Sequence, residues 1–226
     1  MLLKSPKQFG FIFLLVLGFS GCMSTKQLTE IVKSKIESGI PETKFYNTSY
    51  LTLKMDSLVE SDSLVNVKKD NSFFIPAIVF WVWKNSMSCE IRNQYFANVF
   101  AGILQEKAVE FQLQKHLGDK RLEISLEKVP SRFVYSNSGN VIYGLAFYTY
   151  NFSETVYPEG QTLSMSYRIM KDNIELKKEK YIYNFESPYR NFKVSSSRFM
   201  EMYLEQLQLD FENKSSEFIE RIIEEL

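Results

Sequence analysis

The stretch that decides the fold is Ser72–Ile91, SFFIPAIVFWVWKNSMSCEI. Its apolar part, Phe73–Trp83, is rich in aromatic and β-branched residues, which favours a β-strand buried on both faces. Pro76 lacks a backbone N–H, so the first part belongs at a sheet edge or at the start of the strand. Trp81 and Trp83 point to the same face of a strand because they are two residues apart. We interpret that face as core; the alternative is an apolar pocket or a contact with a partner.

A long helix is predicted directly after this strand, over residues 90–116. Ser88 is placed to cap its start, and Gly118 to end it. His116, the only histidine of the chain, would lie near the end of this helix. We interpret it as a solvent-exposed or helix-terminal residue. The apolar residues spaced three and four apart are Phe96, Val99, Phe100, Ile103, Leu104 and Phe111.

Residues 121–129, RLEISLEKV, alternate more clearly than any other segment. Leu122, Ile124 and Leu126 share one face of the predicted strand, and Glu123, Ser125 and Glu127 share the other. Two carboxylates on one face are one requirement for acid–base chemistry. On an alternating strand, however, Glu123 and Glu127 are more simply the solvated face.

The second half of the chain predicts further strands and a closing helix. Turns are expected at 136–140 and 157–161, with a strand between them, and the sequence around Lys171–Asn173 predicts a hairpin. An apolar stripe predicts a helix over about 195–226, capped by Ser195–Ser197, with a bend near 213–215. The pairs Tyr148/Tyr150 and Tyr181/Tyr183 each share a strand face. They stabilise the sheet by cross-strand pairing or, alternatively, line a binding surface.

The segment before the apolar strand alternates with period two over residues 45–70. The near-repeat of Asp56–Val59 in Asp62–Val65 suggests a hairpin turn between them. Residues 23–43 have the character of a tether, with a short helix that Gly39 and Pro41 end. Nothing in that tether is expected to need packing.

This element order predicts an α+β fold, with an antiparallel or mixed sheet and two long helices packed on one face. We expect one domain over residues 44–226. Aromatic residues make up 15% of the chain, enough for a substantial core, so disorder is not expected. The 27 basic and 27 acidic residues balance, which gives no electrostatic reason to expect a nucleic-acid partner.

The start of the chain carries a different signal. Lys4 and Lys7 precede an apolar run, 9–19, that is well short of the roughly 20 residues needed to cross a bilayer. A basic start, a short apolar middle and small residues at a cleavage point are typical of a secretory signal. The sequence Phe19-Ser20-Gly21-Cys22 resembles the lipobox of bacterial lipoproteins, although Phe19 stands where leucine is usual. The alternatives are an ordinary signal peptide with a cysteine nearby, or an uncleaved anchor.

The resemblance implies that the thiol of Cys22 is joined to diacylglycerol and that a peptidase cuts just before it. Residues 1–21 would then be the signal peptide, and 22–43 the lipidated N-terminus and tether. Two or three acyl chains, such as palmitate, on one cysteine suffice for stable membrane anchoring. No Asp follows Cys22, which in enterobacterial lipoproteins favours the outer membrane. No acidic cluster follows either, so we expect the periplasmic face.

Chemistry-bearing motifs are sparse. With Cys22 acylated, Cys89 has no partner for an intrachain disulfide, and we expect a buried free thiol. There is no paired Cys/His spacing for a metal, no Gly-rich phosphate loop and no G-x-S-x-G sequence. We therefore expect no cofactor, no metal and no catalysis.

The order of lipobox, apolar strand, long helix, alternating strand, hairpin and C-terminal helix resembles that of small periplasmic lipoproteins that assist envelope machinery. These include auxiliary lipoproteins of ABC-type transporters and the lipopolysaccharide-assembly lipoprotein. The resemblance spans residues 72–226 at the level of element order, with no motif residues to carry over. It implies a protein that binds a protein partner, such as an envelope complex, or a lipid. The alternatives are a surface-exposed structural or adhesive lipoprotein, and a small enzyme.

Overall fold

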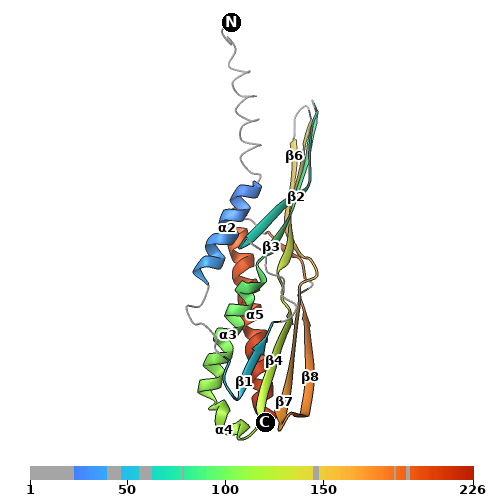
Figure 1. Ribbon diagram of the computed structural model, residues 1–226. Helices are drawn as coiled ribbons and strands as arrows, with labels where there is room; N and C mark the ends of the chain where they lie inside the picture. The colour runs from blue at the N-terminus through green and yellow to red at the C-terminus, as the bar shows by residue number, and fades with distance from the viewer. Residues whose placement is uncertain are drawn as a thin grey trace.

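The computed structural model describes residues 23–39, 47–55, 63–77, 79–144, 148–185, 187–191 and 194–226. Two β-sheets lie end to end, and helices cover one face of both (Figure 1). The expected α+β class, with helices on one face, is confirmed, but the strands divide into two sheets. The helices are α2 (Thr25–Ser38), α3 (Asn93–Glu110), α4 (Leu113–Leu117) and α5 (Ser196–Glu224).

The first sheet, called sheet A, has the strand order β1-β4-β7-β8. Its strands are β1 (Leu51–Lys54), β4 (Arg121–Lys128), β7 (Thr162–Lys171) and β8 (Ile174–Asn184). β1 pairs parallel to β4, and the other pairs are antiparallel, so sheet A is mixed. The apolar side chains of β4 are buried beneath the helices, as its alternation predicts. Asp172 and Asn173 take positive φ angles at the tight β7–β8 turn, which confirms the hairpin expected there.

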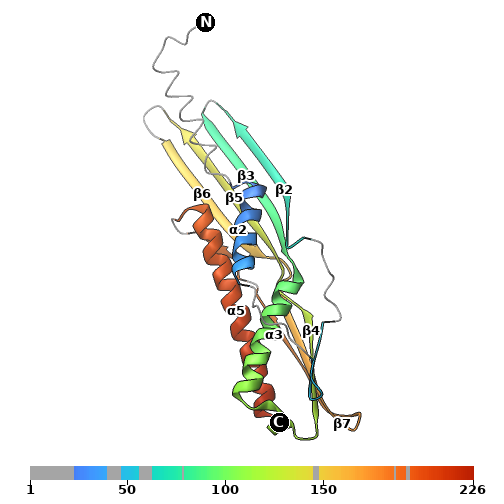
Figure 2. The same cartoon turned by 60° about the vertical axis from the view of Figure 1, so that its left-hand side comes forward.

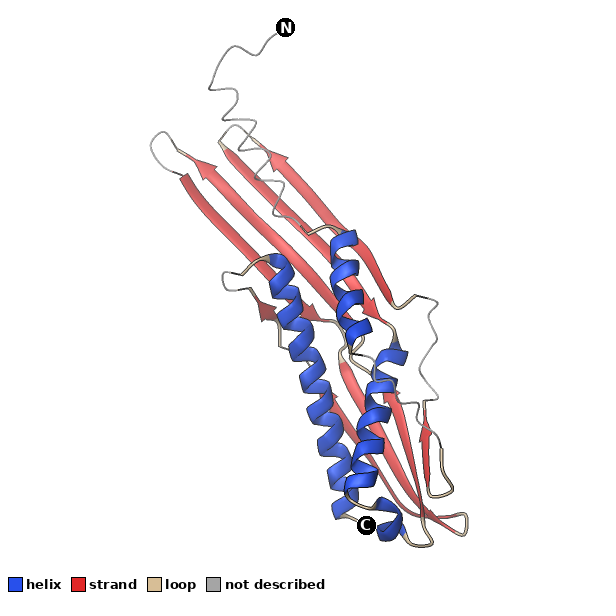
Figure 3. Cartoon of the chain, turned by 90° about the vertical axis from the view of Figure 1, so that its left-hand side faces the viewer, coloured by secondary structure: helices blue, strands red, loops and turns tan. Residues whose placement is uncertain are grey.

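The second sheet, called sheet B, is antiparallel throughout, with the order β2-β3-β5-β6-β9. Its strands are β2 (Val65–Pro76), β3 (Phe80–Ile91), β5 (Arg132–Tyr143), β6 (Tyr148–Pro158) and β9 (Tyr189–Arg190). Four of these strands run on past the ends of α2 and α5, so none of the described helices lies over one end of sheet B (Figure 3).

Helix α5 is the element that holds the two sheets together. Its 29 residues span about 43 Å at the usual helical rise. Tyr203 packs edge-on against Phe133 of sheet B, and Phe218 packs against Tyr167 of sheet A. The helix starts at the Ser195 cap, as predicted, and runs without interruption through 213–215, where a bend was expected.

Helix α2 is part of the core rather than a free tether. Leu28, Val32 and Ile36 have helical spacing and are almost completely buried, and Ser24 forms a capping box with Gln27. The short helix ended by Gly39 is confirmed, but the expectation that nothing here needs packing is wrong. The amphipathic stripe is satisfied by packing against α5 and sheet B (Figure 2).

The long helix predicted over 90–116 is divided. Gln112 adopts a left-handed conformation with φ 50°, which separates α3 from α4, and Gly118 ends α4 as predicted. Ser88 is not the cap, because β3 continues to Ile91 and Arg92 takes the N-cap position without a side-chain hydrogen bond. Phe96 of α3 packs edge-on against Phe211 of α5.

Three other local predictions are wrong. The alternating residues 45–70 do not form a hairpin, because β1 pairs in sheet A and β2 in sheet B; the turn expected between the near-repeats lies outside the described residues. The turn expected at 136–140 is the interior of β5. Phe73–Trp83 is not one strand buried on both faces but the end of a hairpin formed by β2 and β3, which turns near Ala77.

Candidate functional site

The uncovered end of sheet B is the most unusual surface among the described residues. The register of its strands places the residues in transverse rungs whose side chains share a face. On the face that the helices cover lower down, this end carries mostly aromatic side chains. We call this surface the aromatic face; its members are Phe74, Trp81, Trp83, Tyr143, Tyr150 and Phe152.

The rings of the aromatic face contact one another both across the strands and along β6. Trp81 lies edge-on to Tyr143 with ring centroids 5.4 Å apart, and Tyr150 stacks on Phe152 at 6.3 Å. Trp83 lies 6.1 Å from Tyr150. The face is nevertheless open to solvent, since 40% of Phe74, 42% of Phe152 and 56% of Tyr150 is exposed. Within the described ranges no element covers this apolar surface, which is of the kind that marks an interaction site.

Glycine makes the centre of the aromatic face possible. Gly139 lies opposite Trp83 in the β3–β5 ladder, and the indole ring lies over it. A Cβ at this position would meet the Trp83 ring at 2.2 Å and the backbone oxygen of Asn151 at 2.6 Å. A residue without a side chain is therefore required for the ring to lie flat on the sheet.

A buried polar rung separates the aromatic face from the helix-covered core. It comprises Asn85, Asn137 and Glu154, which pair in register on β3, β5 and β6. The indole Nε1 of Trp83 donates to Asn137 Oδ1 at 3.0 Å, so the rung also fixes the nearest ring of the aromatic face. Tyr135 donates its hydroxyl hydrogen to Glu154, and burial together with this carboxylate raises the pKa of that hydroxyl.

The same rung holds the start of the described chain. Asn85 Nδ2 donates to the carbonyl oxygen of Met23 at 3.0 Å, and the Met23 side chain is buried. The residue that precedes Met23 is Cys22, the predicted lipidation site, which lies outside the described residues. Residue 23 is thus fixed against β3 at the border of the aromatic face.

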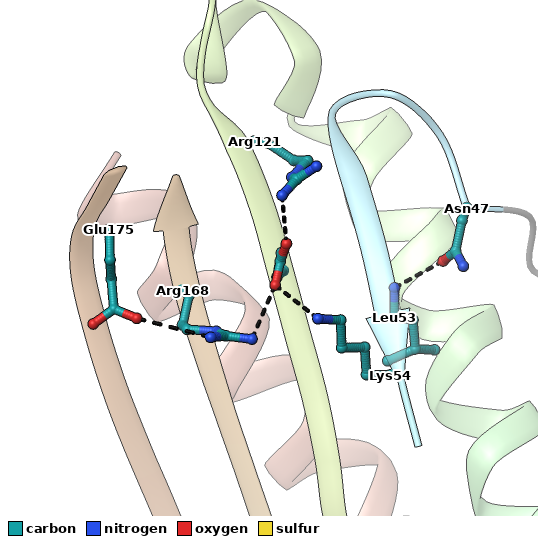
Figure 4. Close-up of polar contacts among 7 residues, drawn as sticks. Asn47, Leu53, Lys54, Arg121, Arg168 and Glu175 are labelled. Atoms are coloured by element: carbon teal, nitrogen blue, oxygen red, sulfur yellow. Dashed lines mark hydrogen bonds and ion pairs between the residues drawn. The ribbon is translucent and has the colours of Figure 1, made fainter. Parts of the chain in front are cut away.

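A second polar cluster lies on the helix-free face of sheet A (Figure 4). Glu123 is only 8% exposed and accepts from Lys54 at 3.0 Å, Arg121 at 2.7 Å and Arg168 at 3.1 Å. The Lys54 hydrogen bond, with the positive charges of both arginines, lowers the pKa of Glu123. Glu175 extends the cluster by pairing with Arg168 at 3.9 Å.

The Glu123 cluster joins strands rather than presenting a reactive group. Lys54 belongs to β1, Glu123 to β4 and Arg168 to β7, so one carboxylate links three strands of sheet A. Glu127, on the same face, accepts from the hydroxyls of Ser164 at 3.1 Å and Ser166 at 2.9 Å, and from Lys180. These interactions keep both carboxylates ionised. The interpretation of the two carboxylates as a solvated face is wrong for Glu123, which its partners bury, while Glu127 is half-buried on the same face.

A cleft of about 560 Å³ lies between the end of sheet A and α5. Gln161 Nε2 donates to the hydroxyl of Tyr203 at 2.9 Å, and the ammonium of Lys214 lies 5.1 Å from the ring centre of Tyr183. The Tyr183 hydroxyl is buried and finds no hydrogen-bond partner among the described residues. Of the charged side chains that line the cleft, Lys214 is paired with Glu217, and Asp210 accepts a hydrogen bond from Gln206.

The other residues singled out in the sequence have structural positions. Cys89 is buried and free, as predicted, and burial raises the pKa of its thiol. His116 is exposed on α4, as predicted. Tyr181 and Tyr183 share the helix-facing side of β8, where Tyr181 packs edge-on against Phe218, so they stabilise the sheet against a helix rather than across strands. The side chain of Tyr148 lies outside the described residues.

The two tryptophans overturn the preferred interpretation of their strand. Trp81 and Trp83 do share one face, but they are half-buried at the uncovered end of sheet B and do not belong to the core. One sequence signal for this surface was available: neither 71–83 nor 139–153 contains an Asp, Glu, Lys or Arg. The alternation of β2 is also lost there, because its residues 72–76 are exposed on both faces.

Comparison with models of protein families, with curated proteins and with solved structures gave no match. Within the described ranges, no three His, Cys, Asp or Glu side chains are grouped so that they could hold a metal ion. None of the helices in those ranges is both long and apolar enough to cross a membrane. The aromatic face is therefore the candidate functional site that the described residues support best.

Proposed function

We propose that this chain is a lipid-anchored, non-catalytic bacterial lipoprotein that binds a protein partner or a lipid in envelope transport or assembly. The observation that supports this best is the aromatic face, an apolar and uncharged surface at the end of the molecule where the described chain begins. Such a surface binds by excluding water, without needing a reactive group.

The N-terminal sequence supports the anchor. Lys4 and Lys7, the short apolar run and the small residues before Cys22 have the order of a lipoprotein signal. Anchoring at Cys22 would place the lipid directly beside Met23, which is fixed to sheet B. We place the protein at the outer membrane, on its periplasmic side.

The chemistry of the side chains supports a binding role. Glu123 and Glu127 are held ionised by cations and hydroxyls, so neither is poised to donate a proton near neutral pH. Cys89 is buried with a raised thiol pKa, which opposes its use as a nucleophile. His116 is exposed on α4, whereas Glu123 and Glu127 belong to β4.

The direct test is the intact mass and membrane fractionation of the native protein beside Cys22→Ala. We expect the wild type to begin at residue 22, to carry the added mass of diacylglycerol and a fatty acid, and to sediment with outer membranes. Cys22→Ala should lack this mass. Cys89→Ala, which changes the only other cysteine, should keep it. An unmodified wild-type chain with a free Cys22 thiol would refute the anchor.

The side of the membrane is tested by labelling exposed lysines on intact cells with an impermeant amine reagent. A protein that faces the periplasm should be labelled only after the outer membrane is permeabilised. Labelling of intact cells would favour the alternative, a surface-exposed structural or adhesive lipoprotein.

A further inference from the structure

We propose that the aromatic face of sheet B lies on the membrane surface, next to the acyl chains of Cys22, and forms a second contact with lipid. This inference rests on the proposed lipid anchor and deepens it, because it gives the anchored domain a defined orientation. The occupant we assign to the aromatic face is the interface of a phospholipid leaflet.

The position of residue 23 supports this occupant. Met23 is held by Asn85, and Trp83 lies two residues further along β3 on the same face. Two residues of a strand span about 7 Å. Because consecutive Cα atoms lie about 3.8 Å apart, acyl chains attached to Cys22 would begin one residue away from a residue that is fixed beside the aromatic face. A lipid surface that accepts those chains has to lie against or close to this end of sheet B.

The composition of the face matches that surface. Tryptophan and tyrosine combine a large apolar ring with one polar atom, and they are enriched where hydrocarbon meets the headgroups. Both tryptophans of the chain and two of its tyrosines, Tyr143 and Tyr150, lie on the aromatic face. The absence of charged residues from 71–83 and 139–153 avoids the cost of bringing a charge to the membrane.

The orientation follows from the sheet edges. Among the described strands, β2 and β6 are the edges of sheet B at this end, and unpaired strand edges do not enter the hydrocarbon region. Docking by the face satisfies this limit, because the rings enter the interface while the strand edges stay among hydrated headgroups. Exposed Lys84 projects from the opposite face, away from the lipid.

The chain contains its own probe. Trp81 and Trp83 are its only tryptophans, so their fluorescence reports on the aromatic face alone. The test uses the mature chain from residue 22 with Cys22→Ala, which carries no acyl group and retains every described core residue. It is mixed with vesicles of phosphatidylethanolamine and phosphatidylglycerol. We expect a blue shift of the emission, and quenching by lipids brominated near the headgroup end of the acyl chains.

Matched variants separate this surface from general stickiness. Phe74→Ser and Phe152→Ser should each weaken partitioning into the vesicles about tenfold, from the apolar area that each phenyl ring exposes. Val109→Ser in α3 and Ile174→Ser at the start of β8 change side chains elsewhere that are 75% and 65% exposed, and they should leave partitioning unchanged. Circular dichroism of each variant checks that it is folded.

Two results would overturn the inference. If vesicles leave the emission of the Cys22→Ala chain unshifted and unquenched, lipid is excluded as the occupant, whatever the surface variants do. A blue shift that depends on protein concentration without vesicles assigns the face to a second copy of the chain. The acylation test is independent of both results. If the native protein is acylated but the Cys22→Ala chain does not respond to vesicles, the anchor is retained and the docking surface is refuted.

Discussion

Replacing Gly139 by alanine is the sharpest perturbation of the aromatic face. The added Cβ would lie 2.2 Å from Trp83 Cζ2, whereas ordinary van der Waals contact begins at 3.4 Å. The ring must therefore withdraw by about 1 Å, and Asn151, whose backbone oxygen is 2.6 Å from the Cβ, leaves little room for the strand to shift instead. Movement of the ring breaks the 3.0 Å hydrogen bond from Trp83 Nε1 to Asn137.

Two costs combine in this variant. Overpacking of a close contact costs about 1–3 kcal/mol. Loss of a hydrogen bond to Asn137, which is completely buried, costs about 1 kcal/mol more. We expect Gly139→Ala to lower the free energy of unfolding by about 2–4 kcal/mol, as the sum of these two costs.

Urea unfolding followed by tryptophan fluorescence measures both the stability and the environment of the rings. Gly139→Ala should lower the midpoint and change the native emission. Ser138→Ala, on the neighbouring residue with its side chain on the opposite face, should do neither. Truncating the ring in Trp83→Ala should relieve part of the cost, which far-UV circular dichroism measures in the double variant. An unchanged midpoint and emission spectrum in Gly139→Ala would refute the placement of Trp83 over Gly139.

Three further predictions concern the rest of the fold. Leu28→Ala should lower the free energy of unfolding by about 2–4 kcal/mol in chemical denaturation, because this completely buried residue packs α2 into the core. An effect near zero would show that α2 is a tether that contributes nothing to the core. Glu123→Gln should cost about 1–2 kcal/mol at pH 7, since the partners of this carboxylate are partly exposed. A lowered folded-state pKa means that the contribution of Glu123 is complete above its ordinary value of 4.5 and is lost as pH falls through the folded-state value. The variant and wild type should therefore converge in acid, and a difference independent of pH would contradict the ion pairing. In the Cys22→Ala chain, Cys89 should react with alkylating reagents only after unfolding in urea; rapid native-state labelling would show that it is accessible.

The sequence was most informative where one periodicity dominates. β4 alternates strictly, and its pattern fixes which side chains face the helices. The apolar stripe and the serine cap place α5 to within two residues of its predicted start. The turns with positive φ at Asp172, Asn173 and Gly160 follow from residue types that tolerate that conformation.

The aromatic face could not be predicted from composition alone. An apolar, aromatic run such as 73–83 reads as core because most such runs are buried, and exposure depends on where the helices end. The exposure of this run is set by the tertiary structure, because α2 and α5 begin part-way along sheet B. The pairing of β1 with β4 was equally out of reach, because it joins residues about 70 positions apart. Gly139 suggested a turn, since nothing local reveals that it accommodates an indole ring.

Because α2 packs against α5, the N-terminal helix cannot complete its packing until the C-terminal helix has been synthesised. The ammonium of Lys35 on α2 lies 3.2 Å from the carboxylate of Glu205 on α5, so the first helix of the described chain depends on the last for its contacts. Synthesis runs from the N-terminus, and α2 and β1 must wait for partners made much later. Contacts between such distant segments also slow folding. A chain interrupted before Ser196 would leave both sheets without the helix that bridges them, and we expect it to be degraded rather than to accumulate as a smaller working domain.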